Sequence, residues 1–205
     1  MKKEIIAVFD FDGTITTKDT LIKFITFTKG KWRLCGVFLF FIPLFIAMKL
    51  KLLPNGKVKQ LLFSHLYKET PVEIFNKWGI EFSAVIDKIL CSKAIEALKS
   101  HKENGDKIVI VSASIENWIK PWADKRGINT VLSTQIEVNA QNRITGKFIT
   151  KNCYGQEKVN RFLTLFPNRQ DYKLVAYGDS RGDKEMLEFA DNGFYKMKIV
   201  HTCIS

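Results

Sequence analysis

Three short apolar runs divide the chain and predict buried parallel strands. They cover residues 5–9, 108–111 and 174–177, and each is rich in β-branched residues or bounded by polar ones. Helical patterns follow, each ending at a glycine or before a proline: residues 92–104, 115–126 and 157–166. Alternating strands and helices favour an α/β fold with a doubly wound parallel, Rossmann-like sheet.

Residues 15–89 interrupt this alternation. The segment offers no apolar run of the buried-strand type and reads as several helices, which predicts an α-helical cap inserted after the first strand. We therefore expect a catalytic core made of residues 1–14 and 90–205, with a cap of residues 15–89. A β-ribbon is predicted at 134–138 and 143–149, with the polar residues 139–142 as its turn.

One part of the predicted cap is unusually apolar. Residues 34–48 are apolar except for the helix-weakening Gly36 and Pro43, and they fall short of the ~20 residues that span a bilayer. Their phenylalanines could form the core of the cap. Alternatively, they could contact an anionic membrane surface, because basic residues flank the stretch on both sides: Lys29, Lys31, Arg33, Lys49 and Lys51. The sequence leaves both interpretations open.

Length and charge limit the class of protein. A chain of 205 residues with 46% hydrophobic residues can bury a substantial core. Its net charge of +11 favours anionic partners. The basic residues are spread along the chain without a nucleic-acid-binding signature, so we expect no nucleic-acid partner. Oligomeric state cannot be predicted.

Cysteine spacing indicates the compartment. The four cysteines, Cys35, Cys91, Cys153 and Cys203, include no close pair, which fits neither a disulfide framework nor a zinc cluster. The first apolar run is too short and wrongly flanked for a secretory signal. We expect a cytoplasmic protein, with membrane association as the alternative that the apolar stretch leaves open.

Polar groups gather where the predicted strands end. Asp10 and Asp12 follow the first strand, Ser112 the second, and Asp179 and Asp183 the third. Ligands of open α/β sheets bind at the carboxyl ends of the strands. Two residues apart, Asp10 and Asp12 can point to one side while Phe11 points into the core. One carboxylate can then stay ionised and attack phosphorus, while the other exchanges a proton with the leaving oxygen.

Together these motifs resemble the haloacid dehalogenase superfamily, through Asp10-Phe11-Asp12-Gly13-Thr14, Ser112, Lys158, Gly178-Asp179 and Asp183. The position of the cap, the run from Val111 to Ser114 and the run from Asn152 to Lys158 are similar to the phosphoserine-phosphatase-like branch. The resemblance covers nearly the whole chain.

The resemblance implies a role for each motif residue. Asp10 would be the nucleophile and a Mg²⁺ ligand, with Asp12 as general acid and base and, through its backbone carbonyl, a second ligand. Asp179 would be the third ligand, and Asp183 would orient the metal site. The phosphoryl oxygens would be held by Thr14, Ser112, Ala113 and Lys158.

Single residues of these motifs could also have purely structural roles. Lys158 could lie on a solvated helix face, and Ser112, Asp179 and Asp183 could cap helices. The sequence also departs from phosphoserine phosphatases, because Asp19 stands where those enzymes carry a cap glutamate. Arg33 is the only arginine in the cap, and Gly182 replaces an asparagine. Phosphoserine is therefore not the favoured substrate, and Asp19, Lys57 and Lys59 are the candidate substrate-binding residues of the cap.

We expect a Mg²⁺-dependent phosphomonoester hydrolase that forms an aspartyl-phosphate on a small phosphorylated metabolite. One alternative is a phosphatase for lipid phosphates, such as phosphatidylglycerophosphate, at a membrane surface. The other is a non-catalytic anion-binding module on the same fold.

Overall fold

A six-stranded sheet forms the centre of the computed structural model, which describes residues 3–202. The strand order is β3-β2-β1-β6-β7-β8, and all neighbours are parallel except β7 and β8. The bounds are β1 Glu4–Phe9, β2 Lys107–Ile115, β3 Thr130–Thr134, β6 Tyr172–Gly178, β7 Asn192–Tyr195 and β8 Lys198–Thr202. The predicted Rossmann-like sheet is confirmed.

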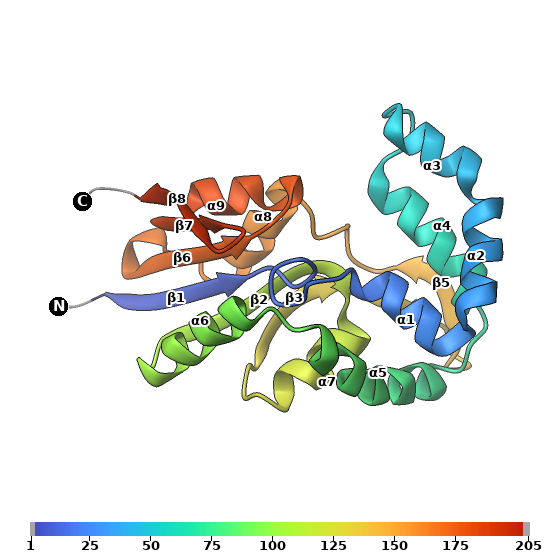
Figure 1. Ribbon diagram of the computed structural model, residues 1–205, viewed down its shortest axis with the longest axis horizontal. Helices are drawn as coiled ribbons and strands as arrows, with labels where there is room; N and C mark the ends of the chain where they lie inside the picture. The colour runs from blue at the N-terminus through green and yellow to red at the C-terminus, as the bar shows by residue number, and fades with distance from the viewer. Residues whose placement is uncertain (1–2, 203–205) are drawn as a thin grey trace.

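Helices cover both faces of the sheet. In Figure 1, α8 (Gln156–Leu165) and α9 (Lys184–Phe189) lie above it, and α6 (Ser92–Glu103) and α7 (Glu116–Asp124) lie below it. Alternate residues of β1 face the two layers, because successive side chains of a strand point to opposite sides. Ile6 and Val8 join the core with α8 and α9, whereas Ala7 and Phe9 join the core on the other face. This burial explains why β1 is apolar from Ile5 to Phe9.

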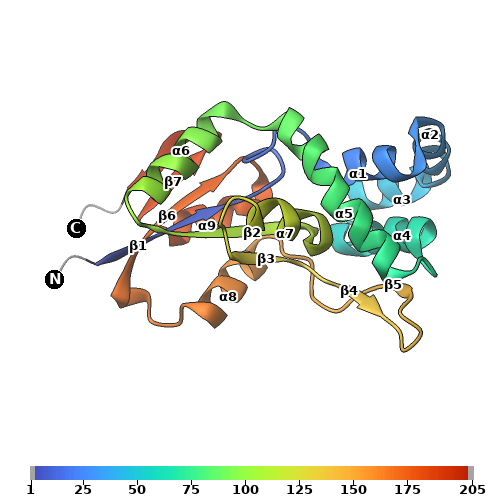
Figure 2. The same cartoon turned by 90° about the horizontal axis from the view of Figure 1, so that it is seen from below.

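The segment between β1 and α6 is helical, as predicted. It contains α1 Thr20–Lys29, α2 Lys31–Phe40, α3 Ile42–Lys49, α4 Asn55–Tyr67, α5 Val72–Ile86 and a 3₁₀ turn at Asp87–Ile89. These helices form the end of the molecule that lies away from both termini (Figures 1 and 2). The predicted boundaries between core and cap, after residues 14 and 89, stay a prediction.

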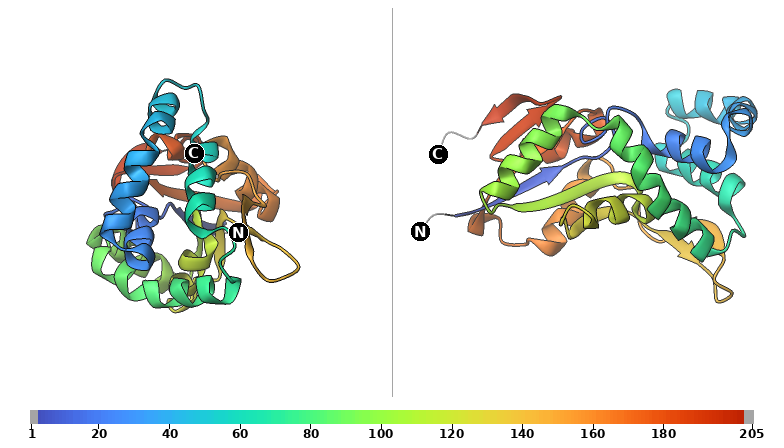
Figure 3. Two further views of the ribbon diagram at one scale, coloured as in Figure 1. Left: turned by 90° about the vertical axis from the view of Figure 1, so that its right-hand side faces the viewer. Right: turned by 60° about the horizontal axis from the view of Figure 1, so that its bottom comes forward.

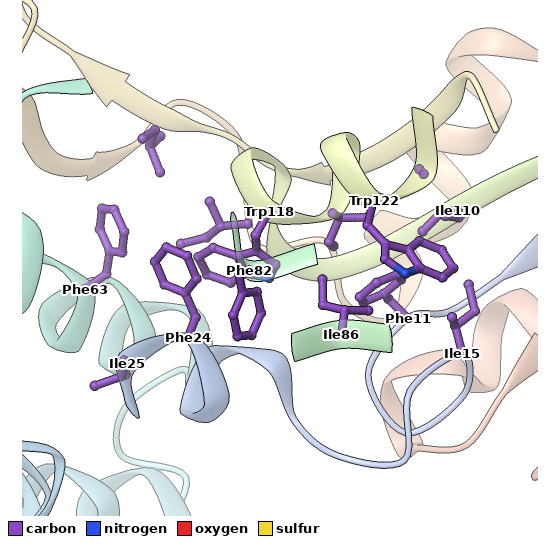
Figure 4. Close-up of a cluster of buried hydrophobic side chains, with 14 of the residues drawn as sticks. Phe11, Ile15, Phe24, Ile25, Phe63, Phe82, Ile86, Ile110, Trp118 and Trp122 are labelled. Carbon is purple, nitrogen blue, oxygen red and sulfur yellow. The ribbon is translucent and has the colours of Figure 1, made fainter. Parts of the chain in front are cut away.

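A continuous apolar core joins this cap to the sheet (Figure 4). On the body side, Phe11 lies edge-on to Trp122, with ring centroids 5.3 Å apart. On the cap side, Phe24 of α1 stacks on Trp118 of α7 at 4.4 Å. Helices α5 and α7 pack so closely that a Cβ at Gly79 would lie 2.0 Å from a backbone carbonyl oxygen of α7. The contact fixes α1 and α5 against the body.

The predicted β-ribbon forms from β4 (Ile136–Val138) and β5 (Ile144–Phe148), which are antiparallel. The ribbon lies against α4, where the rings of Phe63 and Phe148 are 5.3 Å apart. The predicted ribbon strand began at Thr134, but this residue ends β3, a sheet strand that the sequence did not reveal.

Candidate active site

The three polar segments predicted at strand ends meet at one edge of the sheet. Strand β1 lies between β2 and β6, so Asp10 has Ser112 on one side and Asp179 on the other. The Asp10 amide continues the ladder by donating to Tyr177 O at 2.9 Å. Phe11 is fully buried, while Asp10 and Asp12 both line a cleft. As expected, the two aspartates point into the cleft while the phenylalanine between them points into the core.

Lys158 is the buried cation of the site. Its Nζ, carried by α8, lies 2.5 Å from Asp10 Oδ1, 2.5 Å from Asp183 Oδ1 and 3.0 Å from Val111 O. A solvated helix face is the wrong interpretation for this lysine, since only 2% of the residue is exposed. Burial opposes the charged amine, but the ion pairs with the two carboxylates outweigh it and raise the pKa of Lys158. The lysine therefore carries its charge into the site.

Asp183 connects Lys158 to the loop after β6. Its Oδ2 accepts hydrogen bonds from Ser180 N at 2.9 Å, Ser180 Oγ at 2.8 Å and Asp179 N at 3.2 Å. Burial alone would raise the pKa of Asp183, but Lys158 and Ser180 outweigh it and hold the pKa below its usual range. The capping role is also present, because Ser180 and Asp183 form a capping box around the 3₁₀ turn Arg181–Asp183.

Three carboxylates are close enough to share a cation. Side-chain oxygens of Asp10, Asp179 and Asp183 lie within 4.8 Å of one another. Burial and, after it, the charge of Asp183 raise the pKa of Asp179. Because both oxygens of Asp183 are engaged by Lys158 and Ser180, the carboxylates that suit a metal are those of Asp10 and Asp179. Hard carboxylate oxygens fit Mg²⁺.

Gly13 lets the loop after β1 approach this cluster. Its φ of +83° lies in the left-handed region, and a Cβ there would be 2.2 Å from Asp179 Oδ2. The next residue, Thr14, is buried and donates its hydroxyl to Asp179 Oδ1 at 3.2 Å. The Asp-x-Asp-Gly-Thr spacing is thus explained by contact with the loop that follows β6.

The ionised form of Asp10 is disfavoured when no metal ion is bound, even with Lys158 beside it. Burial raises its pKa to about 8 against the opposing effect of Lys158, and the nearby Asp183 and Asp12 raise it further. A divalent cation beside the carboxylate would favour the ionised form. The local charge balance therefore matches a metal site.

Asp12 is held separately from the carboxylate cluster. Its Oδ1 accepts from Thr20 N at 2.7 Å, and its Oδ2 accepts from the Ser114 hydroxyl. Thr20 Oγ1 in turn donates to Ser114 Oγ at 3.3 Å and accepts from Trp118 Nε1 at 3.1 Å. Burial, followed by the charge of Asp19, raises the pKa of Asp12. Metal ligation by the Asp12 carbonyl stays a prediction.

Ser114 and Thr20 were not among the predicted site residues. The signal for Ser114 was its place two residues after Ser112, which puts both side chains on one side of an extended strand. We expected a helix from residue 115, but β2 continues to Ile115 and α7 begins at Glu116. Ser112 is therefore not a helix N-cap, and its Oγ accepts from Ser114 N at 3.1 Å.

Comparison with known proteins agrees with this geometry. Residues 7–188 match the family model of haloacid dehalogenase-like hydrolases. The chain belongs to this family. It is 32% identical over 195 residues to Protein CicA of Caulobacter vibrioides, covering 94% of this chain and 86% of that protein.

Two further similarities come from phosphatases. The chain is 30% identical over 95 residues to a histidinol-phosphatase of Neisseria meningitidis, which covers 44% of this chain and 43% of that enzyme. Its fold matches a phosphoserine phosphatase solved as a phospho-aspartyl intermediate analogue, with a TM-score of 0.61 and 21% identity over 95% of this chain and 86% of the other. The family and its fold are thus shown for nearly the whole chain.

The cleft of this hydrolase has a polar floor and an apolar roof. It encloses about 360 Å³ above Asp10 and Asp12, and Ser112, Ala113, Ser114 and Lys158 line it with them. The cap contributes a largely apolar surface: Leu21, Ile22, Phe38, Phe45, Met48, Val58 and Leu62. No arginine lies among the described residues that line the cleft, and Arg33 is exposed on α2.

The structure separates the three candidate cap residues. Asp19 lines the cleft and also caps α1, accepting from Ile22 N at 3.0 Å. Lys59 lines the cleft and donates to Ala113 O, and burial lowers its pKa to about 8. Lys57 is exposed and lies outside the set that lines the cleft, because the polar face of α4 on which it sits turns to solvent.

Proposed function

We propose that the protein is a Mg²⁺-dependent phosphomonoesterase that forms an aspartyl-phosphate on Asp10. The observation that carries this proposal is the contact of buried Lys158 with both Asp10 and Asp183, beside Asp179 and at the floor of a cleft. An anion entering the cleft would meet a fixed positive charge beside a nucleophile. The similarity to a histidinol-phosphatase supports the same reaction class.

Asp10 and Asp12 divide the chemistry in this proposal. A carboxylate oxygen of Asp10 attacks phosphorus, the bond from phosphorus to the ester oxygen breaks, and Asp12 gives its proton to that oxygen. Asp12 then takes a proton from the water that attacks the aspartyl-phosphate, which releases phosphate and restores Asp10. The raised pKa of Asp12 suits a group that must be protonated in the first step.

The other residues bind and orient. Lys158 balances negative charge on the phosphoryl group, while Ser112 and Ala113 line the cleft where its oxygens would lie. Thr14 is outside the set that lines the cleft, and its hydroxyl donates to Asp179. Asp10 and Asp179 would hold Mg²⁺, supported by Asp183, and the ion would neutralise charge on the phosphoryl oxygens. Ser114 and Thr20 hold Asp12 in position through its two oxygens.

The cap surface points to the leaving group of the substrate. Apolar side chains of α1 and of the helical pair α2 and α3 face the catalytic aspartates, whereas Lys59 and Asp19 supply the cap's charged groups. The leaving group is then a small metabolite that places apolar surface beside the phosphate. A free carboxylate, as in phosphoserine, finds no arginine among the described cleft residues, which supports a different substrate.

A lipid phosphate monoester is the second candidate substrate. The specific observation is that Phe38, Phe45 and Met48, all from the apolar stretch of the cap, line the cleft. A panel of water-soluble phosphomonoesters, tested beside phospholipid monoesters with and without detergent, would separate the two substrate classes. Faster turnover of the lipid esters would favour the second candidate.

Hydrolysis of p-nitrophenyl phosphate tests the reaction itself. We expect turnover with Mg²⁺, its loss in EDTA, and a fall of at least about 10³-fold in Asp10→Asn. Asp12→Asn should slow both steps. Asp124→Asn, the same chemical change at an exposed surface ion pair, is the matched control and should keep full activity. Absence of turnover across the substrate panel would instead support a non-catalytic anion-binding module.

A further inference from the structure

The bent pair of helices α2 and α3 contributes little to the core of the protein. Only Val37 is buried in α2, and no residue is buried in α3, although α3 is apolar except for its final lysine. The α2–α3 pair forms the upper left of the molecule when it is viewed onto the cap end (Figure 3, left). Its exposed apolar side chains are Trp32, Leu39, Phe40, Ile42, Ile46 and Leu50.

These exposed side chains follow helical spacing. Positions 32, 39 and 40 share one side of α2, and positions 42, 46 and 50 lie at intervals of four along α3 and its C-cap. The opposite side of each helix is occupied, since Phe41 is buried and Phe38 and Phe45 line the cleft. Phe40, by contrast, is 69% exposed and Trp32 is 91% exposed. The α2–α3 pair therefore has an inner apolar face that lines the cleft and an outer apolar face in solvent.

The positive charge of the chain is concentrated in the segment that contains this pair of helices. No acidic residue occurs between Asp19 and Glu69, a stretch that holds nine lysines and arginines, while the other 23 basic residues stand against 21 acidic ones. At the two ends of the α2–α3 pair, Lys31, Arg33, Lys49 and Lys51 are exposed. Within the part of the chain that the structure describes, none of these four pairs with a carboxylate. This distribution complements an anionic surface.

We propose that the outer face of the bent α2–α3 pair docks on the surface of an anionic lipid bilayer. Exposed apolar residues between basic ends suit the boundary of acyl chains and headgroups. No single described helix is long and apolar enough to cross a membrane; α2 and α3 meet the requirement only as a pair, bent by 59°. A bent pair of short helices fits a position within the interface.

Nucleic acid and a second copy of the chain are less suitable partners for the α2–α3 pair. Nucleic acid would use the positive charge but leave the exposed leucines and isoleucines unpartnered, since its surface is dominated by phosphates. A symmetric dimer would bring the basic ends of two α2–α3 pairs together, because the same patch faces itself across the symmetry axis. The anionic bilayer satisfies both the apolar surface and the charge.

Flotation with liposomes tests the proposal on the full chain. We expect the protein to float with vesicles of equal parts phosphatidylcholine and phosphatidylglycerol, and to bind pure phosphatidylcholine vesicles weakly. Phe40→Asp should lower partitioning at least about tenfold, because the ring no longer transfers from water. Ile149→Asp is the matched control, since Ile149 is 67% exposed and lies outside the α2–α3 pair. This variant should bind the vesicles as the wild type does. Thermal melts of both variants verify that they are folded.

The fluorescence of Trp32 supplies a second signal that depends on the α2–α3 pair alone. The other three tryptophans are buried or half-buried. Adding anionic vesicles should shift the fluorescence to the blue in the wild type and not in Trp32→Phe. Asp10→Asn should show the same binding and shift as the wild type, so docking and catalysis are judged separately.

Several results would overturn the proposal. Absence of flotation, or flotation that Phe40→Asp leaves unchanged, would remove the docking face. A concentration-dependent dimer that Phe40→Asp dissociates, found together with no vesicle binding, would also overturn the proposal. Binding to RNA or DNA with no flotation would assign the basic charge to nucleic acid instead.

Discussion

Replacing Lys158 with methionine should both destabilise the protein and silence the site. The amine makes contacts of 2.5 Å with Asp10, 2.5 Å with Asp183 and 3.0 Å with Val111 O, and the residue is almost fully buried. Methionine fills a similar volume but leaves two buried carboxylates without their cation. Removing one partner of a buried ion pair costs about 3–5 kcal/mol of unfolding free energy.

The size of this effect can be converted into a melting temperature. For a chain of this length each kcal/mol corresponds to about 2–4 °C, so Lys158→Met should melt about 10 °C below the wild type in EDTA. Mg²⁺ should recover part of the loss, because a cation at Asp10 and Asp179 replaces some of the missing positive charge. Turnover should fall about 10²–10³-fold through loss of phosphoryl stabilisation.

Calorimetry and the p-nitrophenyl phosphate assay measure the two effects. Lys99→Met is the control, because Lys99 is exposed and its ion-pair partner among the described residues is Glu103, on the surface of α6. Its stability should change by less than about 1 kcal/mol. A Lys158→Met protein that melts with the wild type in EDTA would refute the account of Lys158 as the cation that balances the buried carboxylates.

Three further predictions concern the loops and the metal. Gly13→Ala should weaken Mg²⁺ binding and lower the melting temperature, because its Cβ would occupy the space of Asp179; wild-type Mg²⁺ affinity by isothermal titration would contradict this. Although burial opposes it, hydrogen bonds from Leu174 N and Arg169 hold the pKa of Asp191 below its usual range, so this carboxylate stabilises the fold above about pH 4 and less as the pH falls further. Urea denaturation should therefore show Asp191→Asn to be less stable than the wild type at pH 7, by about 1–2 kcal/mol, with the difference shrinking below about pH 4; a pH-independent gap would be the contrary result. EDTA should abolish turnover and Mg²⁺ restore it, whereas Ca²⁺ should inhibit, since its larger and more flexible coordination can occupy both oxygens of the nucleophilic carboxylate; full activity of metal-stripped protein would rule this out.

The sheet and its catalytic edge could be predicted from the sequence because the signals are local. Apolar runs fully buried on both sides mark β1, β2 and β6, and each is followed directly by its polar residues. Strands β3 and β7 lacked such a signal, since β3 is only partly buried and β7 has four residues. Strand β3 lies at one edge of the sheet and β7 lies next to the other edge strand, β8, and the place of both is set by their neighbours rather than by their own composition.

Other features depend on contacts between distant segments. The hydrogen bonds that Thr20 and Ser114 make to Asp12 bring together two residues that are 94 positions apart. The sequence spacing of these two residues does not predict this contact. The burial of Lys158 follows from two carboxylates that arrive from β1 and from the loop after β6. The apolar stretch 34–48 could not be assigned to core or surface from its composition, because Phe41 is buried and its neighbour Phe40 is exposed.

Chemical trapping of the intermediate tests the central proposal most directly. The protein would be mixed with a phosphomonoester and Mg²⁺, quenched in acid within the first turnovers, digested and examined by mass spectrometry. We predict that the peptide containing Asp10 gains one phosphoryl group, that hydroxylamine removes it, and that Asp10→Asn shows neither the modification nor turnover. Turnover by Asp10→Asn at the wild-type rate, or wild-type turnover with a phosphoryl group on a different residue, would contradict the assignment of Asp10 as the nucleophile.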